Sequence, residues 1–438
     1  MHDRNVWTSV DPPDKSKILY CRWVYTVKTN QTDGSKTFKA TLVASGFNQT
    51  AGVDYSDVFS PVVDFSVIRF MFILFVSILC WNHVQLDIRA AYLYGNLSET
   101  IYMHQPPGFV NKGEENKVYL LHKSIYGLKQ SGCKWNEELD STLNSISFPK
   151  LNWCNGVYSL KGKCFLLVYV DDLLTFGRTI EILNETIKLL KDKFHVKVLG
   201  NVKYLLGVNF DTIEGDLSLH QKTYIDRIER KFKGIPRSYV NLPVKTGISL
   251  HSKINPSEIS ENYLMKKFPY RSLIGCLSFI AERSPPDISF AVNVMAQFSN
   301  NYNYQHWLYV VDILNYVFNT KEYKINLRVF EELSLKSYSD ASWGCELTDR
   351  YSTSGFIVCL ANVPFMWKSR KQKTIALSSI ESEFIAITDS VKELIWFSNI
   401  LNELKVVTDV KPVHYCDNMP AIYFCKNNFE SSNILKIS

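Results

Sequence analysis

The stretch Phe165-Leu166-Leu167-Val168-Tyr169-Val170-Asp171-Asp172-Leu173-Leu174-Thr175-Phe176-Gly177 places two adjacent carboxylates between two apolar runs. Both runs are rich in β-branched and aromatic residues, so each predicts a strand, and the aspartates fall at the tip of a hairpin. Two carboxylates at a rigid, partly desolvated tip repel each other unless a cation is bound, and Mg²⁺ is the usual partner of an all-oxygen site. A solvated Asp-Asp turn is the alternative, but the apolar flanks favour the metal site.

Length and composition bound the class of protein. The 438 residues are enough for about three domains, and 46% hydrophobic with 21% charged residues is typical of a globular chain with a sizeable core. The net charge of +6 permits a polyanionic partner without requiring one. The ten cysteines are scattered and form no C-x-x-C, which favours a reducing compartment over a zinc site or a disulfide framework.

The most apolar run, residues 70–81, is bounded by Arg69 and His83. At 12 residues it is too short to span a bilayer, so it predicts a buried helix. The first residues contain no apolar signal core. We therefore expect an intracellular protein with no membrane segment.

Three stretches supply further candidates. Residues 18–27 and 37–44 alternate as strands around a turn at 32–35, which predicts a hairpin that is either a solvated surface element or a basic flap over a phosphate-bearing ligand. Asp87 ends a short apolar strand, where an acid is most often a helix cap and becomes a metal ligand only if it faces Asp171 and Asp172. Gly127 permits close backbone approach, and Lys129 can reach a phosphate or base.

The remaining periodicities predict the order of elements. Apolar spacing indicates helices over 134–145 and 180–194, and a hairpin turned at 214–216 follows. A polar, loop-like composition over 242–260 indicates a boundary, and residues 261–330 are expected to be largely helical.

The last part of the chain again places acidic residues at strand ends and beside a helix. Strands end at Asp340 and Asp417, and Glu383 lies beside the apolar stripe of a helix over 379–404. Three acids in matching structural places suggest a second two-metal cage, although helix capping by the two aspartates is the alternative.

A set of ordered motifs extends over nearly the whole chain. They are Lys39-Ala40-Thr41-Leu42-Val43-Ala44-Ser45-Gly46-Phe47-Asn48-Gln49, Phe59-Ser60-Pro61-Val62-Val63, Gln85-Leu86-Asp87, Gln105-Pro106-Pro107-Gly108-Phe109, Tyr126-Gly127-Leu128-Lys129-Gln130, Tyr169-Val170-Asp171-Asp172, Asp340-Ala341-Ser342-Trp343, Ser352-Thr353-Ser354-Gly355 and Leu377-Ser378-Ser379-Ile380-Glu381-Ser382-Glu383. In this order they resemble the reverse transcriptase and ribonuclease H region of copia-type LTR retrotransposon Pol polyproteins.

The resemblance implies an α+β fold. It implies a right-hand polymerase with fingers, palm and thumb over residues 1–245, a helical connection over 246–334 and a ribonuclease H-like α/β domain over 335–438. The implied partners are an RNA template, a DNA primer, an RNA–DNA hybrid and dNTPs, with no membrane. The implied location is cytoplasmic, in a virus-like particle, and extends to the nucleus. The sequence leaves the oligomeric state open.

The resemblance also implies roles for particular residues. Asp87, Asp171 and Asp172 would hold two Mg²⁺ ions, with Mn²⁺ as an alternative, and Asp340, Glu383 and Asp417 would hold the metals of hybrid cleavage. Nucleotide and template contacts are implied at Lys39, Tyr92, Tyr126, Gly127 and Lys129, and a primer grip at Tyr204, Leu205, Leu206 and Gly207. Tyr92 would crowd the sugar 2′-hydroxyl, and Lys197 is a candidate general acid to pyrophosphate.

The chain also departs from the family pattern. Thr41 replaces a usual arginine, Gly132 and Cys133 replace a usual Pro-Arg pair, and Ser438 stands at the end, where a further histidine and acid are expected. We therefore expect an intact polymerase metal triad, weakened nucleotide contacts and impaired hybrid cleavage in a domain truncated at its C-terminus. The alternative is a decayed transposon relic that at most binds nucleic acid.

Overall fold

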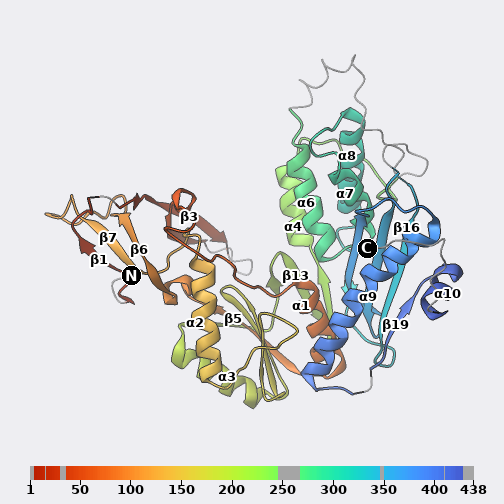
Figure 1. Ribbon diagram of the computed structural model, residues 1–438, viewed down its shortest axis with the longest axis horizontal. Helices are drawn as coiled ribbons and strands as arrows, with labels where there is room; N and C mark the ends of the chain where they lie inside the picture. Colours follow the sequence, from red (N-terminus) through yellow and green to blue (C-terminus); the bar gives the residue numbers. More distant parts are fainter. Residues whose placement is uncertain are drawn as a thin grey trace. The chain divides into compact units, whose positions relative to one another are not determined.

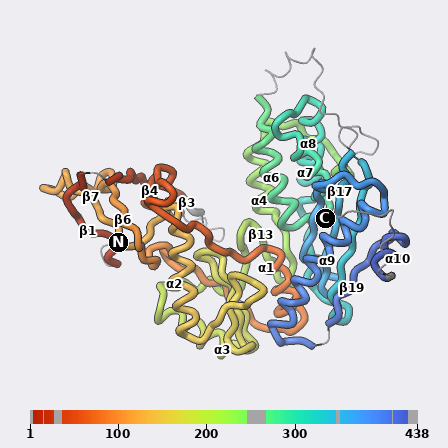
Figure 2. Tube along the Cα trace, viewed as in Figure 1, coloured from red at the N-terminus to blue at the C-terminus, as the bar shows by residue number. Residues whose placement is uncertain are grey.

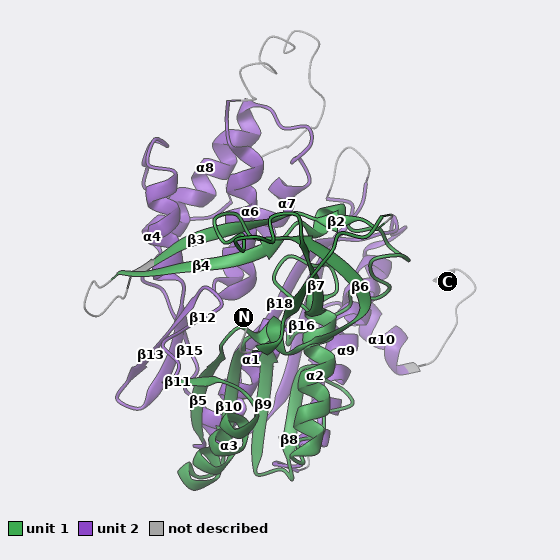
Figure 3. Cartoon of the chain, turned by 90° about the vertical axis from the view of Figure 1, so that its left-hand side faces the viewer, with its two compact units in different colours: residues 1–63, 82–201 green, residues 64–81, 202–438 purple. Residues whose placement is uncertain are grey.

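The computed structural model describes residues 4–14, 16–29, 36–244, 267–345, 350–408 and 410–427. The chain divides into two compact units, residues 1–63 with 82–201 and residues 64–81 with 202–438, coloured separately in Figure 3. The chain therefore passes from the first unit to the second, returns, and leaves the first unit again after residue 201.

The first unit contains a five-stranded sheet. Its strands, in spatial order, are β11 (Val196–Gly200), β5 (Asn82–Ile88), β10 (Asp172–Gly177), β9 (Cys164–Tyr169) and β8 (Val157–Leu160). Helices α2 (Ser131–Ser145) and α3 (Ile180–Lys193) bury their apolar stripes against one face, in a core shared with Leu86, Val168 and Leu173. Because side chains alternate along a strand, neighbouring residues such as Asp87 and Asp172 lie on the other face.

A second sheet and a long hairpin complete this unit. The sheet contains β1 (Trp7–Val10), β7 (Val118–Lys123), β6 (Asn96–His104) and β2 (Ile18–Leu19), and the hairpin pairs β3 (Cys21–Thr29) with β4 (Lys36–Ala44). Two short 3₁₀ turns, η2 (Gly46–Asn48) and η4 (Ala91–Tyr94), follow β4 and β5. The predicted strands of the hairpin are confirmed, whereas its turn at 32–35 lies outside the described residues.

The apolar run forms the buried helix that was predicted, but with different bounds. A helix α1 (Phe65–Met71) begins five residues earlier than expected, with the Asp64 side chain capping the backbone N–H of Ser66, and continues as a π-helix, η3 (Phe72–Ile78). Arg69 is buried inside the helix and does not bound it. This segment belongs to the second unit, although its neighbours in sequence belong to the first.

The second unit contains a four-stranded mixed sheet. Its order is β18 (Val363–Lys371), β17 (Thr353–Leu360), β16 (Leu335–Ser342) and β19 (Pro412–Tyr415), with β19 parallel to β16. The long helix α9 (Ser379–Leu404) lies across this sheet, and α10 (Met419–Asn427) follows β19 (Figure 1). The predicted bounds of α9 are confirmed.

The rest of the second unit is a small sheet and a helical bundle. The sheet contains β12 (Tyr204–Leu205), β13 (Val208–Ile213), β14 (Asp216–His220) and β15 (Ile325–Asn326), and the helices are α4 (Lys222–Lys231), α6 (Tyr270–Arg283), η6 (Pro286–Ile288), α7 (Ser289–Ala296) and α8 (Tyr304–Asn319). Figure 2 shows α6, α7 and α8 packed side by side, and the four α-helices share one apolar core. Most of the boundary segment expected over 242–260 lies outside the described residues.

The described chain confirms the expected α+β class and most element positions. Besides α1, two helices begin or end away from their predicted residues: α2 starts at Ser131, three residues early, and α3 ends at Lys193. Among the described helices, none combines the length and apolar character needed to cross a bilayer.

Candidate active sites

The hairpin between β9 and β10 holds the first site. Its tip is Val170 and Asp171, and Val170 has a positive φ of +58°. A β-branched residue is sterically disfavoured there, so the tip conformation must be imposed by its surroundings. The indole N–H of Trp135, from α2, donates to the Val170 carbonyl at 2.8 Å and fixes the tip.

Three residues form a row across the open face of this sheet. Asp172 lies directly opposite Asp87 on β5, and Asp87 lies directly opposite Lys197 on β11. Directly opposed residues share a face, so the two carboxylates and the lysine point the same way. The Asp171 carbonyl accepts a hydrogen bond from the Ile88 amide at 2.9 Å, which joins the tip to the end of β5.

The structure thus brings Asp87 together with Asp171 and Asp172, which lie 84 and 85 positions later in the chain. All three are half-buried. Their donor atoms are all carboxylate oxygens, which fits Mg²⁺ or Mn²⁺. Within the described residues they do not form a group whose ligand atoms all lie within 4.8 Å of one another.

Two tyrosines lie beside this cluster. Ala90, with a φ of +53°, turns the chain after β5 and places Tyr92 in η4, where its ring lies 4.8 Å from that of Tyr126 in an edge-to-face arrangement. Burial, followed by the charge of Asp171, raises the pKa of both phenols, to about 12 for Tyr126. Both hydroxyls therefore stay neutral near the carboxylates.

The loop that carries Tyr126 approaches the end of β4 very closely. Gly127 has a φ of +96°, and a Cβ there would lie 2.2 Å from the Ala44 carbonyl oxygen. Lys129 is exposed on the same loop. Lys39 is exposed on β4 opposite Thr26, farther along the hairpin.

The predicted primer-grip segment belongs to the second unit. Tyr204 and Leu205 form β12, and Leu206 and Gly207 make a tight turn with φ values of +49° and +89°. A Cβ on Gly207 would lie 2.6 Å from the ring of Phe279 of α6, so the aromatic ring covers this turn.

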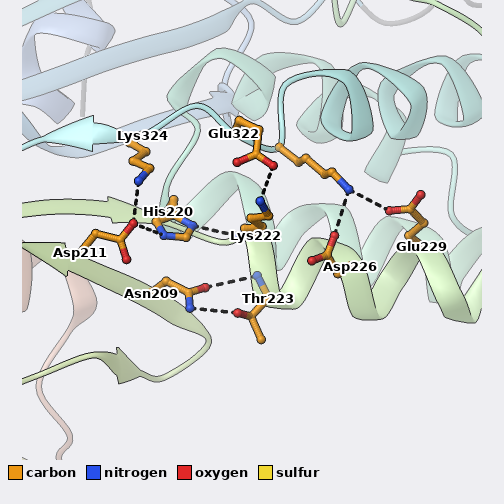
Figure 4. Close-up of polar contacts among 10 residues, drawn as sticks. Asn209, Asp211, His220, Lys222, Thr223, Asp226, Glu229, Glu322 and Lys324 are labelled. Carbon is orange, nitrogen blue, oxygen red and sulfur yellow. Dashed lines mark hydrogen bonds and ion pairs between the residues drawn. The ribbon is translucent and has the colours of Figure 1, made fainter. Parts of the chain in front are cut away.

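A polar network fixes the hairpin behind that turn (Figure 4). The Asn209 side-chain amide donates to the Thr223 hydroxyl at 2.9 Å, which ties β13 to α4. Asp211 lies 3.0 Å from His220 and 2.6 Å from Lys324, and the Lys324 hydrogen bond lowers the pKa of Asp211 most. The turn at residues 206–207 therefore leads into a hairpin whose first strand, β13, is held by these polar contacts.

The second site lies on the mixed sheet. Ligand atoms of Glu383, Cys416 and Asp417 all lie within 4.8 Å of one another, and Asp340 is close enough to raise the pKa of Glu383. Burial raises that pKa most, because Glu383 is 6% exposed. The sequence reasoning found the three acids but missed Cys416, whose thiol lies 3.9 Å from Glu383 Oε2. Its position beside Asp417 at the end of a strand was the available signal.

A groove of about 370 Å³ runs beside Asp340. Ser342, Thr353 and Lys368 line it from the sheet, and Phe290 lines it from α7. The groove thus combines polar groups, one cation and an aromatic ring next to an acid.

Comparison with known proteins defines the class of this chain. Residues 4–245 match the family described as reverse transcriptase (RNA-dependent DNA polymerase), and the chain belongs to that family. Its relatives place it with retrotransposon Pol polyproteins of the copia type.

The chain is 35% identical over 429 residues to the retrovirus-related Pol polyprotein from transposon RE2 of Arabidopsis thaliana, covering 97% of this chain and 29% of that protein. It is 34% identical over 425 residues to the one from transposon TNT 1-94 of Nicotiana tabacum, covering 96% and 32%. It is 32% identical to the putative transposon Ty5-1 protein YCL074W of Saccharomyces cerevisiae, covering 70% of this chain and 100% of that protein. The chain thus spans about a third of the long polyproteins.

Among solved structures, a foamy viral protease-reverse transcriptase in complex with double-stranded DNA is similar over 96% of this chain and 62% of that chain. The sequence identity is 14% and the TM-score 0.49.

Proposed function

We propose that this chain is an RNA-directed DNA polymerase that adds dNTPs to a primer 3′-hydroxyl on an RNA template. The observation that supports this most is the direct opposition of Asp87 and Asp172, with Asp171 at the adjoining tip. Family membership supports the reaction class, and the all-oxygen donor set suits the two divalent ions that such a reaction uses.

Asp87, Asp171 and Asp172 would hold the two Mg²⁺ ions, with Mn²⁺ as an alternative. Ions held there would lower the pKa of the primer hydroxyl and offset charge on the triphosphate. The protein's own part is to keep the carboxylates in place, through the paired strands and the Trp135 hydrogen bond.

The other residues of this unit would position substrate. The Tyr92 ring, backed by Tyr126, would crowd a 2′-hydroxyl and favour dNTPs over rNTPs. Lys39 and Lys129 would offset triphosphate or template charge. Lys197, opposite Asp87, has an ammonium group that could give a proton to the leaving pyrophosphate.

The second unit would bind nucleic acid. The backbone of Tyr204, Leu205, Leu206 and Gly207 would grip the primer strand. Asp340, Glu383 and Asp417 would hold the metal ions of a ribonuclease H-like site acting on the RNA strand of an RNA–DNA hybrid, with the groove beside Asp340 taking a strand by shape and 2′-hydroxyl contacts.

Primer extension on an RNA template with Mg²⁺ tests the proposal. The wild type and Asp192→Asn, a surface change on α3, should extend the primer, whereas Asp171→Asn should not. The specific observation that favours a relic is Thr41, half-buried on β4 where the family usually has an arginine. If the wild type binds a primer–template duplex but does not extend the primer, the chain is a decayed relic whose remaining function is to bind nucleic acid.

A further inference from the structure

The end of β4 and the loop at residues 126–130 are joined through their backbones. The Ala44 amide donates to the Tyr126 carbonyl at 2.8 Å. Two glycines make this approach possible, because a Cβ on Gly46 would lie 1.9 Å from the Gly127 carbonyl oxygen and one on Gly127 would lie 2.2 Å from the Ala44 oxygen. Any larger residue would force the two segments apart.

A buried pair of amide side chains locks this junction. Gln49 and Gln130 are 8% and 0% exposed. The Gln49 amide nitrogen donates to the Gln130 side-chain oxygen at 3.0 Å, and Gln130 donates in turn to the Asp54 carbonyl at 2.9 Å. The Gln49 side-chain oxygen accepts the backbone amide of Lys129 at 2.8 Å. The pair therefore fixes the backbone of the loop at Lys129 and ties its end at Gln130 to the segment that carries Asp54.

The loop that the pair holds also carries Tyr126, whose phenol lies near the carboxylates. Tyr126 lies against Tyr92, and the charges of Asp171 and Asp87 both reach its phenol. Lys129 follows three residues later. The glutamines themselves are buried among protein groups, so they act on the site only through this loop and the root of the β3/β4 hairpin.

We propose that Gln49 and Gln130 are positioning residues for the incoming nucleotide. The inference rests on the proposed polymerase function and deepens it. The amide pair sets the distance between the hairpin root and the loop that carries Tyr126, and so sets where Tyr126 stands beside Tyr92 and the carboxylates. It contributes nothing to the chemical step itself.

The test is single-nucleotide incorporation with Gln49→Met, Gln130→Met and the double variant. Methionine keeps the volume of glutamine and removes its hydrogen bonds, so packing is preserved. Displacement of a substrate-positioning loop by up to about one ångström typically lowers the efficiency of nucleotide incorporation by roughly tenfold to a hundredfold. Each single variant should raise the KM for dNTP by about tenfold with kcat within about twofold, and the double variant should be no worse than either single one, because both changes break one network.

Gln105→Met is the matched control. Gln105 is also buried, at 8% exposed, and its side chain bonds the backbone of Asn111 and Lys117 at 2.9 and 3.0 Å in the loop between β6 and β7. It should lower stability as Gln49→Met does but leave the KM unchanged. Hydrogen exchange gives a readout independent of activity: the Lys129 amide should exchange faster in Gln49→Met and not in Gln105→Met.

The outcomes separate the two claims. Active enzymes with equal KM values, or a KM raised equally by the Gln105 control, overturn the positioning role and leave the polymerase function standing. A wild-type chain that extends no primer overturns both.

Discussion

Replacement of Arg69 should break a junction inside the second unit. This guanidinium is 3% exposed; its Nε donates to the Phe365 carbonyl of β18 at 2.6 Å, and its Nη1 donates to the Glu282 and Arg283 carbonyls at 3.0 and 2.8 Å. The last two carbonyls end α6, where no intrahelical donor is available. Arg69 therefore caps α6 from α1, and its charge also complements the negative end of that helix.

The magnitude follows from these contacts. Arg69→Met leaves three buried carbonyls without their donor, and each costs about 1 kcal/mol or more, while the variant regains the cost of burying a cation. That cost is real, because burial lowers the pKa of Arg69 to about 9. The stack of the guanidinium on the Trp367 ring, 4.1 Å from its centre, is also lost. We expect a net loss of about 3 kcal/mol in the free energy of unfolding of this unit.

Arg69→Lys separates charge from geometry. An ammonium keeps the charge but cannot present the planar fork that reaches β18 and α6 together, so the loss should be about half as large. Urea denaturation of the full chain measures both values, and exchange of the Ser284 amide, which bonds Ile280 at the end of α6, reports the local opening. Arg178→Met, an exposed arginine, is the control. A methionine variant within about 0.5 kcal/mol of the wild type, or an unchanged Ser284 amide, would refute the capping argument.

Four further results are expected. Asp172→Asn should abolish primer extension. It should also remove any rise in thermal stability on adding Mg²⁺, since a bound cation offsets the repulsion between opposed carboxylates. If Mg²⁺ stabilised the variant as much as the wild type, this would count against the metal site. Burial lowers the pKa of His83 to about 4, below its ordinary 6.5, so below pH 6.5 protons bind the unfolded chain more readily than the folded one. Between pH 7 and pH 5 the free energy of unfolding of the wild type should therefore fall by about 2 kcal/mol more than that of His83→Asn, as measured by urea denaturation. The pKa of Glu383 is raised, so its ionised form lowers the stability of the folded chain above pH 4.5. Without metal, Glu383→Gln should therefore need more urea to unfold than the wild type at pH 7, and no more than the wild type below pH 4.5. The same variant should lack hybrid cleavage. Gly127→Ala should destabilise the first unit by about 2 kcal/mol or more, measured by the same denaturation, because it meets both a left-handed φ and the Ala44 carbonyl.

The sequence predicted what depends on local patterns. The apolar runs rich in β-branched and aromatic residues on either side of Asp171 and Asp172 indicated the two strands, and the bounds predicted for α9 match to the residue. The pairing of Asp87 with Asp172 was a conditional prediction, since only the position of the acid at a strand end was visible.

What could not be predicted depends on contacts between distant residues. Arg69 beside an apolar run resembles the polar end of a helix, and nothing nearby indicates that its partners lie 213, 214 and 296 positions away. Gln49 and Gln130 stood at the ends of two motifs, but their mutual hydrogen bond joins residues 81 positions apart. Burial of a polar side chain is decided by partners that periodicity does not reveal.

The excursion of residues 64–81 into the second unit constrains how this gene can be shortened. The ring of Phe70 lies 5.3 Å from that of Phe365 and 5.2 Å from that of Phe397, so a fragment ending near residue 245 would leave an apolar segment without its cover. Such a fragment should self-associate when it is expressed alone. Co-expression of residues 335–408 as a separate chain should increase its soluble fraction. Residues 335–408 thus supply part of the packing that keeps this earlier segment buried.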